Sequence, residues 1–402
     1  MATPLTTAEI IRHYRNEDVA RVALEIASHP DRSFILQQIE GWQRLRHKLP
    51  AWTEEEELLY PPRLSAEQCS GQLAAQYKAR IAANLPTEKR TFIDLTGGFG
   101  VDFYYIARHF EKAAYVERQA GLADIVAHNL TLLGLDNAHF FVGNAKNYLE
   151  CIKEKIDLIF LDPARRDTSG RKMAALNNCE PNVLSLLPLL KEKARFTMLK
   201  LSPMLDIAAT CKSLHCVSDV HVVAEKGECK DLLLILSHEA QPLSISITAA
   251  DSNFRPFRFT LEEEANCKPA YLEERMLEEI RYLYDPSPAL LKAGALKLPA
   301  TRLGLMKLHP NTHLYASAAC VSDFPGRTFR IVGHCGVSKG ELRKAGCHAV
   351  HQAHLTTRGF PQSTATLRQQ LRMSEGGSEY WFATTIASGA KRLFRCTKTE
   401  EK

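Results

Sequence analysis

The sequence predicts an α/β protein with a parallel sheet at its centre, a helical lobe before it and small α+β modules after it. Residues 91–238 alternate between apolar runs typical of strands and stretches typical of helices, an order that builds parallel sheets covered on both faces. The last two strands, Val220–Glu225 and Leu232–Ser237, are too close for a helical crossover, so they predict an antiparallel hairpin. Residues 1–88 carry apolar residues at three- and four-residue spacing, which indicates helices.

Length and composition favour a globular protein of several domains: 402 residues, of which 45% are hydrophobic and 24% are charged. The formal net charge of +5 permits an acidic partner such as nucleic acid without requiring one. No apolar run approaches the roughly 18 residues of a membrane span, and the N-terminal residues lack a signal-peptide core. The 11 cysteines form no C-x-x-C pair. Free thiols in a reducing compartment explain them best, so we expect a cytoplasmic protein.

We expect four parts along the chain. They are a helical lobe at 1–88, the α/β domain at 89–272, a small connecting module at 273–318 and an α+β module at 319–398. A ferredoxin-like fold is one interpretation of the connecting module. The individual elements that we expect include helices at Phe34–Leu49, Ala66–Ala83 and Glu273–Leu283, a strand at Ala349–Thr356, and a helix at Ser363–Leu371 capped by Ser363.

The stretch Thr91–Asp102, TFIDLTGGFGVD, is the centre of the predicted function. A strand ends in an acid, a tight glycine turn follows, and a helix begins at once, which is the layout that brings a ligand to the carboxyl edge of a parallel sheet. The third glycine of a dinucleotide fingerprint would fall at Phe103, which disfavours a nicotinamide cofactor. The candidate ligand-binding residues of this stretch are Asp94, Thr96, Gly97, Gly98 and Gly100.

Polar residues also follow the next two strands. Glu117 ends the second strand, and an acid about 20 residues past the glycine turn can accept both hydroxyls of a ribose. Glu117 therefore favours a ligand that contains a nucleoside. Asn144 and Ala145 follow the third strand, and the side-chain oxygen of Asn144 can accept a hydrogen bond.

The fourth strand ends in Asp162-Pro163-Ala164-Arg165. A carboxylate there can hold an amine, aim its lone pair at a reacting carbon and take its proton. Arg165 and Arg166 begin a basic run that either contacts phosphates or is a solvated loop. Lys200 and Ser202 close the fifth strand at the same edge and are further pocket candidates.

These strand-end motifs resemble those of class I S-adenosylmethionine (SAM) methyltransferases, whose Rossmann-like sheet also ends in an antiparallel hairpin. The resemblance implies SAM as the cofactor, held by Asp94, the glycine turn, Glu117, Asn144 and Ala145, with the Asn144 oxygen accepting from the amino group of the adenine. Asp162-Pro163-Ala164-Arg165 is similar to the [DN]-P-P-x motif of enzymes that methylate nitrogens, with Ala164 in place of the second proline. Uridine C5 methyltransferases share D-P-x-R but need a cysteine near Ser202, so direct in-line transfer is the preferred mechanism.

The C-terminal segments HLTTRGF (His354–Phe360) and FATTIASGAKRLFR (Phe382–Arg395) resemble the THUMP-like domain of a group of bacterial methyltransferases. True THUMP domains bind RNA, so the resemblance implies an RNA substrate, either ribosomal or transfer RNA. The basic residues that support this reading are Arg358, Arg368, Arg372, Lys391, Arg392 and Arg395.

The leading hypothesis is therefore a SAM-dependent methyltransferase that acts on a base nitrogen of structured RNA. One alternative keeps methyl transfer but takes DNA, a protein or a small molecule as the acceptor. Another is a non-catalytic RNA-binding protein with a relic SAM fold. The histidines near Cys347 do not match the spacing of a zinc site, so we expect no metal. The sequence leaves the oligomeric state open.

Overall fold

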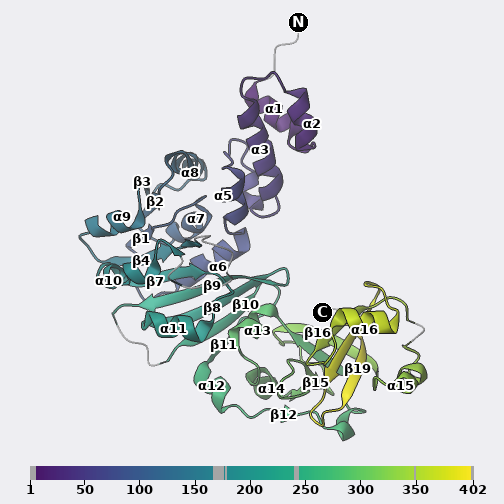
Figure 1. The fold of residues 1–402 in the computed structure, drawn as a ribbon. Helices are drawn as coiled ribbons and strands as arrows, with labels where there is room; N and C mark the ends of the chain where they lie inside the picture. The colour runs from purple at the N-terminus through teal and green to yellow at the C-terminus, as the bar shows by residue number, and fades with distance from the viewer. Residues whose placement is uncertain (1–5, 166–175, 177–178, 240–243, 348–349, 400–402) are drawn as a thin grey trace. The chain divides into compact units, whose positions relative to one another are not determined.

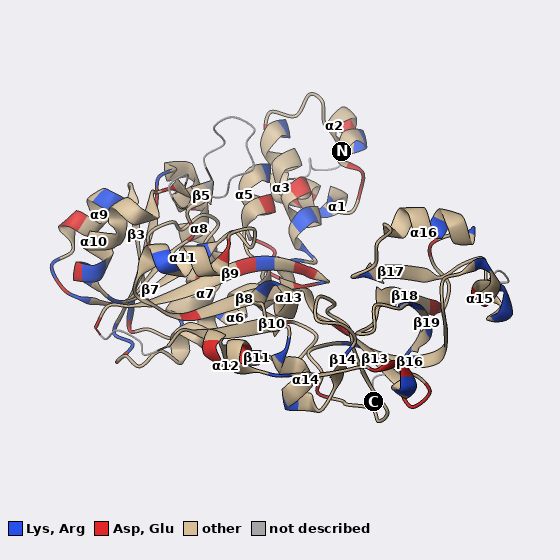
Figure 2. Cartoon of the chain, turned by 60° about the horizontal axis from the view of Figure 1, so that its bottom comes forward, with Lys and Arg blue, Asp and Glu red and all other residues tan. Residues whose placement is uncertain are grey.

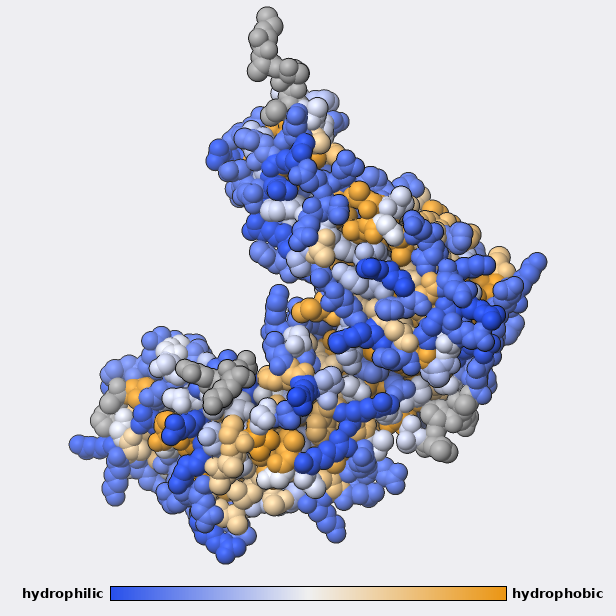
Figure 3. All heavy atoms as spheres, turned by 180° about the vertical axis from the view of Figure 1, so that it is seen from behind, coloured by the Kyte–Doolittle hydropathy of each residue, from blue (hydrophilic) through white to orange (hydrophobic). Residues whose placement is uncertain are grey.

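The computed structural model describes residues 6–165, 176, 179–239, 244–347 and 350–399 (Figure 1). The chain forms two compact units, one made of residues 1–218 and 233–243 and the other of residues 219–232 and 244–402. Each unit is described by itself below. Within the described ranges, no helix combines the length and apolar character that a membrane crossing requires. On the face drawn in Figure 3, hydrophilic residues predominate and apolar atoms form separate patches.

The first unit begins with helices that are short because the sequence interrupts them. Their bounds are α1 (Thr7–Tyr14), α2 (Val19–Glu25), α3 (Arg32–Leu45), α4 (Pro50–Thr53), α5 (Arg63–Gln68) and α6 (Gln72–Ala83). The predicted helix Phe34–Leu49 ends early, because Pro50 begins a new helix, as its missing N–H allows. The predicted helix Ala66–Ala83 is wrong as one element: Cys69 to Gly71 are extended, and Gly71 caps α6.

A nine-stranded sheet follows, in the order β11-β10-β8-β9-β7-β4-β1-β2-β3, and its residues 219–232 and 246–260 are counted with the second unit. Its strands are β1 (Thr91–Asp94), β2 (Lys112–Glu117), β3 (Ala138–Val142), β4 (Ile156–Leu161), β7 (Ala194–Leu201), β8 (Val217–Glu225), β9 (Glu228–Ser237), β10 (Ser246–Asp251) and β11 (Phe257–Thr260). The helices between them are α7 (Val101–Ala107), α8 (Ala120–Leu132), α9 (Ala145–Cys151), α10 (Val183–Lys193) and α11 (Ile207–Leu214). Strands β1, β2, β3, β4 and β7 pair in parallel, which confirms the predicted fold class.

The predicted hairpin is formed by β8 and β9. Only Lys226 and Gly227 separate the two strands, and both have positive φ values, +52° and +80°. Positive φ at both central residues is the conformation that suits a two-residue hairpin, and glycine adopts it without strain. The sheet then continues, because β10 pairs in parallel with β8 and β11 pairs antiparallel with β10.

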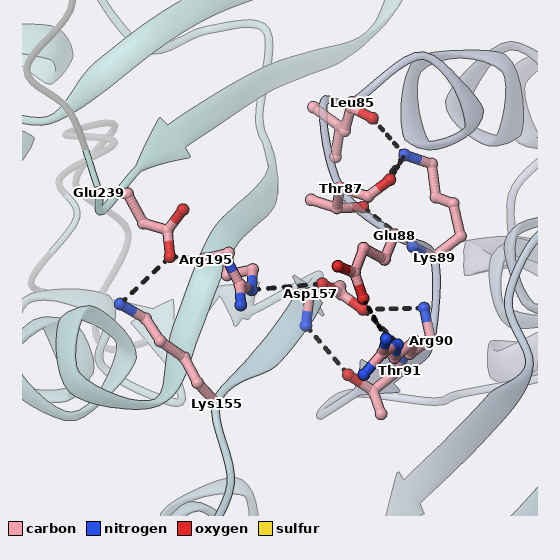
Figure 4. Close-up of polar contacts among 10 residues, drawn as sticks. All are labelled: Leu85, Thr87, Glu88, Lys89, Arg90, Thr91, Lys155, Asp157, Arg195 and Glu239. Atoms are coloured by element: carbon pink, nitrogen blue, oxygen red, sulfur yellow. Dashed lines mark hydrogen bonds and ion pairs between the residues drawn. The ribbon is translucent and has the colours of Figure 1, made fainter.

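A polar network fixes the amino edge of this sheet (Figure 4). The buried Asp157 accepts hydrogen bonds from the backbone N–H groups of Arg90 and Thr91, at 2.8 and 3.1 Å, and forms an ion pair with Arg195 at 3.4 Å. Arg195 also pairs with Glu239 at 3.0 Å. The network ties β4 to the start of β1 and to β7, so the opposite ends of these three strands emerge together at the carboxyl edge.

The helices α4–α6 share one core with the sheet. Trp52 of α4 is 1% exposed and packs against Phe99 and Tyr104, with ring centroids 5.5 and 5.4 Å apart. Phe92 of β1 stacks on Phe103 of α7 in the same cluster. The first three helices have a smaller core of their own, made of Ile10, Val22, Ile26, Ile35 and Ile39. The lobe is therefore divided: its second half belongs to the α/β core.

The second unit contains an eight-stranded sheet in the order β12-β14-β15-β13-β16-β19-β18-β17. Its strands are β12 (Ala270–Tyr271), β13 (Tyr282–Pro286), β14 (Met306–Lys307), β15 (Tyr315–Ser317), β16 (Gly326–Cys335), β17 (His354–Arg358), β18 (Glu379–Thr385) and β19 (Lys391–Lys398). Its helical elements are α12 (Leu261–Asn266), η2 (Glu274–Met276), α13 (Pro288–Ala293), α14 (Leu298–Leu303), α15 (Lys339–Lys344) and α16 (Thr364–Leu371). Ser363 caps α16 as predicted.

Two predictions for this unit are wrong. Glu273–Leu283 is not a helix but a 3₁₀ turn followed by the start of β13. Leu277 and Ile280 are buried at helix-like spacing, yet Leu283 and Tyr284 lie fully buried in a strand between two neighbours, and this tertiary pairing overrides the local signal. Within Ala349–Thr356, the strand begins only at His354.

Candidate active site at the carboxyl edge of the sheet

The glycine turn brings the backbone close to the sheet edge. Gly98 and Gly100 have positive φ values of +54° and +77°, and Gly100 precedes α7. Gly97 needs its lack of a side chain for space, because a Cβ there would lie 2.1 Å from the ring of Tyr115. The hydroxyl of Tyr115 donates to the Gly98 carbonyl at 2.5 Å. The turn is therefore held in a tight, predefined conformation.

Asp94 is the most perturbed acid at this edge. Its side chain is buried, and burial, together with the nearby Asp102 and Asp162, raises its pKa to about 8 even though Thr96 donates to it. In the part of the chain that the structure describes, no Lys or Arg forms an ion pair with Asp94. A buried acid without a counter-ion is costly to ionise, so this position favours a cationic ligand group such as an ammonium.

Thr96 joins the ends of two strands. Its N–H donates to Asp94 Oδ1 at 2.9 Å, and its hydroxyl lies 3.3 Å from the same oxygen. The hydroxyl oxygen also accepts a hydrogen bond from the Asp162 N–H at 2.6 Å. The two acids that the sequence predicted at separate strand ends therefore lie in one site.

The carboxylate of Glu117 accepts a hydrogen bond from the glycine turn. Its Oε2 accepts from the Gly98 N–H at 3.0 Å, and its Oε1 accepts from the N–H groups of Arg118 and Gln119 at 2.8 and 3.0 Å. A ribose that bound to Glu117 would compete with the Gly98 amide for the same carboxylate.

The side chain of Asn144 has a structural role that the sequence pattern did not predict. Asn144 is the N-cap of α9, and its side-chain oxygen accepts from the Asn147 N–H at 2.9 Å. The oxygen expected to accept from an adenine is thus already in a hydrogen bond, while Ala145 is buried as the first residue of α9.

Asp162 follows β4, and its carboxylate forms an ion pair with Lys200 of β7, with 2.5 Å between Oδ2 and Nζ. Pro163, the next residue in the sequence, is buried. Arg165 lies in the short strand β5 (Ala164–Arg165), which pairs with β6 (Cys179–Glu180), whereas Arg166 lies outside the described residues. Ser202 follows β7, and its hydroxyl accepts from the Met204 N–H at 3.2 Å.

A buried ion pair lies close to this site. Lys78 of α6 is fully buried, and its Nζ lies 2.7 Å from Asp102 Oδ1 and 2.6 Å from the Ser70 hydroxyl. The sequence pattern assigns no role to Asp102. One available signal was an acid in the first turn of the helix after the glycine turn, which burial obliges to find a partner.

The structure assigns the remaining candidate, Arg358, to the second unit. Its guanidinium forms an ion pair with the buried Asp285 at 3.2 Å, and Arg327 binds the same carboxylate at 2.6 Å. Among the described residues, no group of three His, Cys, Asp or Glu side chains is arranged to hold a metal. His354 pairs with Glu375, and His348 is outside the described part.

The fold matches a solved bacterial structure over nearly the whole chain. The crystal structure of a protein from Porphyromonas gingivalis W83, provisionally named a methyltransferase, is 38% identical, covers 98% of both chains and superimposes with a TM-score of 0.85. The chain belongs to the class I SAM-dependent methyltransferases that carry a C-terminal THUMP-like domain. Residues 282–325 of this methyltransferase match a ferredoxin-like domain family, and residues 326–398 match a THUMP domain-like family.

Other solved structures are similar to part of this methyltransferase only. A protein from Pyrococcus horikoshii, provisionally named an RNA methyltransferase, is 15% identical and covers 44% of this chain and 90% of its own, with a TM-score of 0.33. TrmK from M. capricolum, solved with S-adenosyl-homocysteine, is 11% identical and covers 41% of this chain and 70% of its own, with a TM-score of 0.31. No curated protein has a significant sequence match to the chain.

Proposed function

We propose that this methyltransferase transfers a methyl group from SAM directly to a base nitrogen of structured RNA, either ribosomal or transfer RNA. The observation that carries the proposal is the Thr96 bridge, which places Asp94 and Asp162 in one site at the carboxyl edge. One acid suits a cationic donor and the other suits an acceptor amine, so donor and acceptor would meet between them.

The residues present suit SAM. SAM supplies an electrophilic methyl group on a sulfonium sulfur. Asp94 would bind the ammonium of its amino acid part, which is the counter-ion that this buried acid lacks among the described residues. Glu117 would accept the ribose hydroxyls, and Asn144 and Ala145 would border the adenine. The amides of Gly97, Gly98 and Gly100 would lie along the amino acid part.

Asp162 would hold the acceptor. Its side chain is 37% exposed, whereas Asp94 is buried, so Asp162 is the more accessible of the two acids. A carboxylate oxygen that accepts an N–H of an exocyclic amine turns the nitrogen lone pair toward the methyl carbon. Pro163 limits the backbone freedom of the following turn, while Arg165, Arg166, Lys200 and Ser202 would border the substrate.

Charge supports RNA as the acceptor. Residues 326–398 contain 12 Lys and Arg but only three Asp and Glu, a net charge of +9 in a chain whose total is +5. Acids outside this range neutralise part of the charge, because Arg327 and Arg358 are paired with Asp285 and Arg392 is paired with Glu274. Lys and Arg on α15 and α16 are visible in Figure 2, and Lys339, Arg343 and Lys344 of α15 are exposed. Such excess positive charge favours binding to the phosphate backbone of a nucleic acid.

The proposal is tested in two steps. Calorimetry should detect SAM binding to the wild type, and Asp94→Ala combined with Glu117→Ala should abolish it. Mass spectrometry of nucleosides from a deletion strain should then show the loss of one methylated nucleoside and its return with the wild-type gene. SAM binding without any lost nucleoside would redirect the search to DNA, protein or small-molecule acceptors. RNA binding without SAM binding would indicate the relic fold.

A further inference from the structure

Two lysines at the carboxyl edge are each paired with a carboxylate. Lys200 is only 11% exposed and lies 2.5 Å from Asp162, while Lys78 is fully buried and lies 2.7 Å from Asp102. The first pair follows from strand register: Leu161 of β4 pairs with Leu199 of β7, so the next residues, Asp162 and Lys200, end neighbouring strands side by side.

The two pairs interact with each other. Burial alone would raise the pKa of Asp102, but Lys78 and then Lys200 oppose burial and hold it below its ordinary value. The Ser70 hydroxyl donates to Asp102 Oδ2 at 2.7 Å and accepts from Lys78 at 2.6 Å. Lys78 of α6 therefore favours the ionised form of Asp102, and the Asp102 carboxylate also attracts Lys200.

Charges therefore alternate across the site, from Lys78 through Asp102 and Lys200 to Asp162. Asp94 at the end of β1 and the thiol of Cys69 also lie near this row.

We propose that Lys200 is a positioning residue that holds the Asp162 carboxylate in the orientation in which it accepts an N–H of the acceptor amine. The inference rests on the proposed function. The carboxylate, fixed by Lys200, turns the nitrogen lone pair toward the methyl carbon. The acceptor nitrogen attacks the methyl carbon, the electrons of the broken C–S bond stay on sulfur, and the methylated nitrogen then loses its extra proton to water.

The test compares Lys200→Met with the conservative Lys200→Arg and with Lys212→Met, an exposed lysine on α11, as the control. Full-length proteins are assayed with radiolabelled SAM and total RNA from the deletion strain, in single turnovers. Lys200→Met should slow transfer at least about tenfold at pH 7, because the Asp162 carboxylate loses the contact that orients it. Lys200→Arg should largely restore the rate.

A wild-type rate in Lys200→Met, or no recovery in Lys200→Arg, would overturn the proposal. SAM affinity within twofold of the wild type in each variant would exclude a defect of cofactor binding. An independent readout is a crystal structure of Lys200→Met without RNA, in which the Asp162 carboxylate should leave its position beside residue 200. This readout does not require RNA methylation, so failure of the proposed function and failure of this inference remain distinguishable.

Discussion

Asp94 illustrates at the scale of one residue how a binding site can oppose stability. The carboxyl lies at the end of β1, buried near two other acids, and its pKa is raised to about 8. Ionising it in the empty site is unfavourable, whereas an ammonium ligand would compensate the charge. Two predictions follow from the sign of this shift.

SAM should bind more tightly as the pH rises from 6 to 7.5, because a larger fraction of Asp94 is ionised before the ligand arrives. For a pKa near 8 the affinity should increase about tenfold per pH unit in this range. Calorimetry at several pH values measures the slope. Asp94→Asn should bind SAM weakly and without this slope, and a flat wild-type profile would contradict the assignment.

The same shift predicts that Asp94→Asn stabilises the empty protein. A carboxyl whose pKa is higher in the folded state binds protons preferentially there, so it makes stability fall as the pH rises from about 4 to about 8. At pH 8 the variant should gain at least about 1 kcal/mol in the free energy of unfolding. At pH 4 the gain should vanish, and urea denaturation at both pH values tests this.

At the scale of elements, the turn needs its glycines for two different reasons: Gly97 for space and Gly98 for its backbone conformation. Gly97→Ala should cost about 1–3 kcal/mol, because the new Cβ would lie 2.1 Å from the Tyr115 ring. Gly98→Ala meets no atom closer than 3.8 Å, yet its φ of +54° should cost about 1–2 kcal/mol in backbone strain. Gly121→Ala in α8 is the matched control: it has open space, so it should be neutral or slightly stabilising. Chemical denaturation of the three variants ranks them.

Features that depend on neighbouring residues in sequence were predictable. The acids Asp94, Glu117 and Asp162 end strands as expected, and Ser363 caps its helix. A strand-end acid or a cap is set by a few adjacent residues, so local patterns suffice to find it.

Features that depend on tertiary contacts were not predictable. Lys78 and Asp102 are 24 positions apart in the sequence, and only the packing of α6 on α7 brings them together. Lys200 finds Asp162 through the register of β4 and β7. The oxygen of Asn144 was assigned to a ligand, but capping of α9 already uses it, because the same residue type serves both purposes.

At the scale of the whole molecule, the charge is concentrated in the THUMP-like domain, which has +9 in a chain of +5. We expect binding of a labelled transfer RNA to weaken steeply with salt. The triple variant Lys339→Gln, Arg343→Gln and Lys344→Gln should reduce the slope of log affinity against log salt by about 2–3. Fluorescence anisotropy measures the slope. Lys112→Gln, Lys146→Gln and Lys212→Gln form the control, and an equal loss in both triples would refute a role for α15.

The packing of Trp52 has a spectroscopic consequence. Its indole touches Phe99, which belongs to the glycine turn, while Trp381 lies in the core of the THUMP-like domain. Replacing Trp42 and Trp381 by Phe would leave one fluorophore whose emission reports on the cofactor loop alone. A change in its intensity on adding SAM, absent in Asp94→Ala, would follow occupancy of the site in real time without any label.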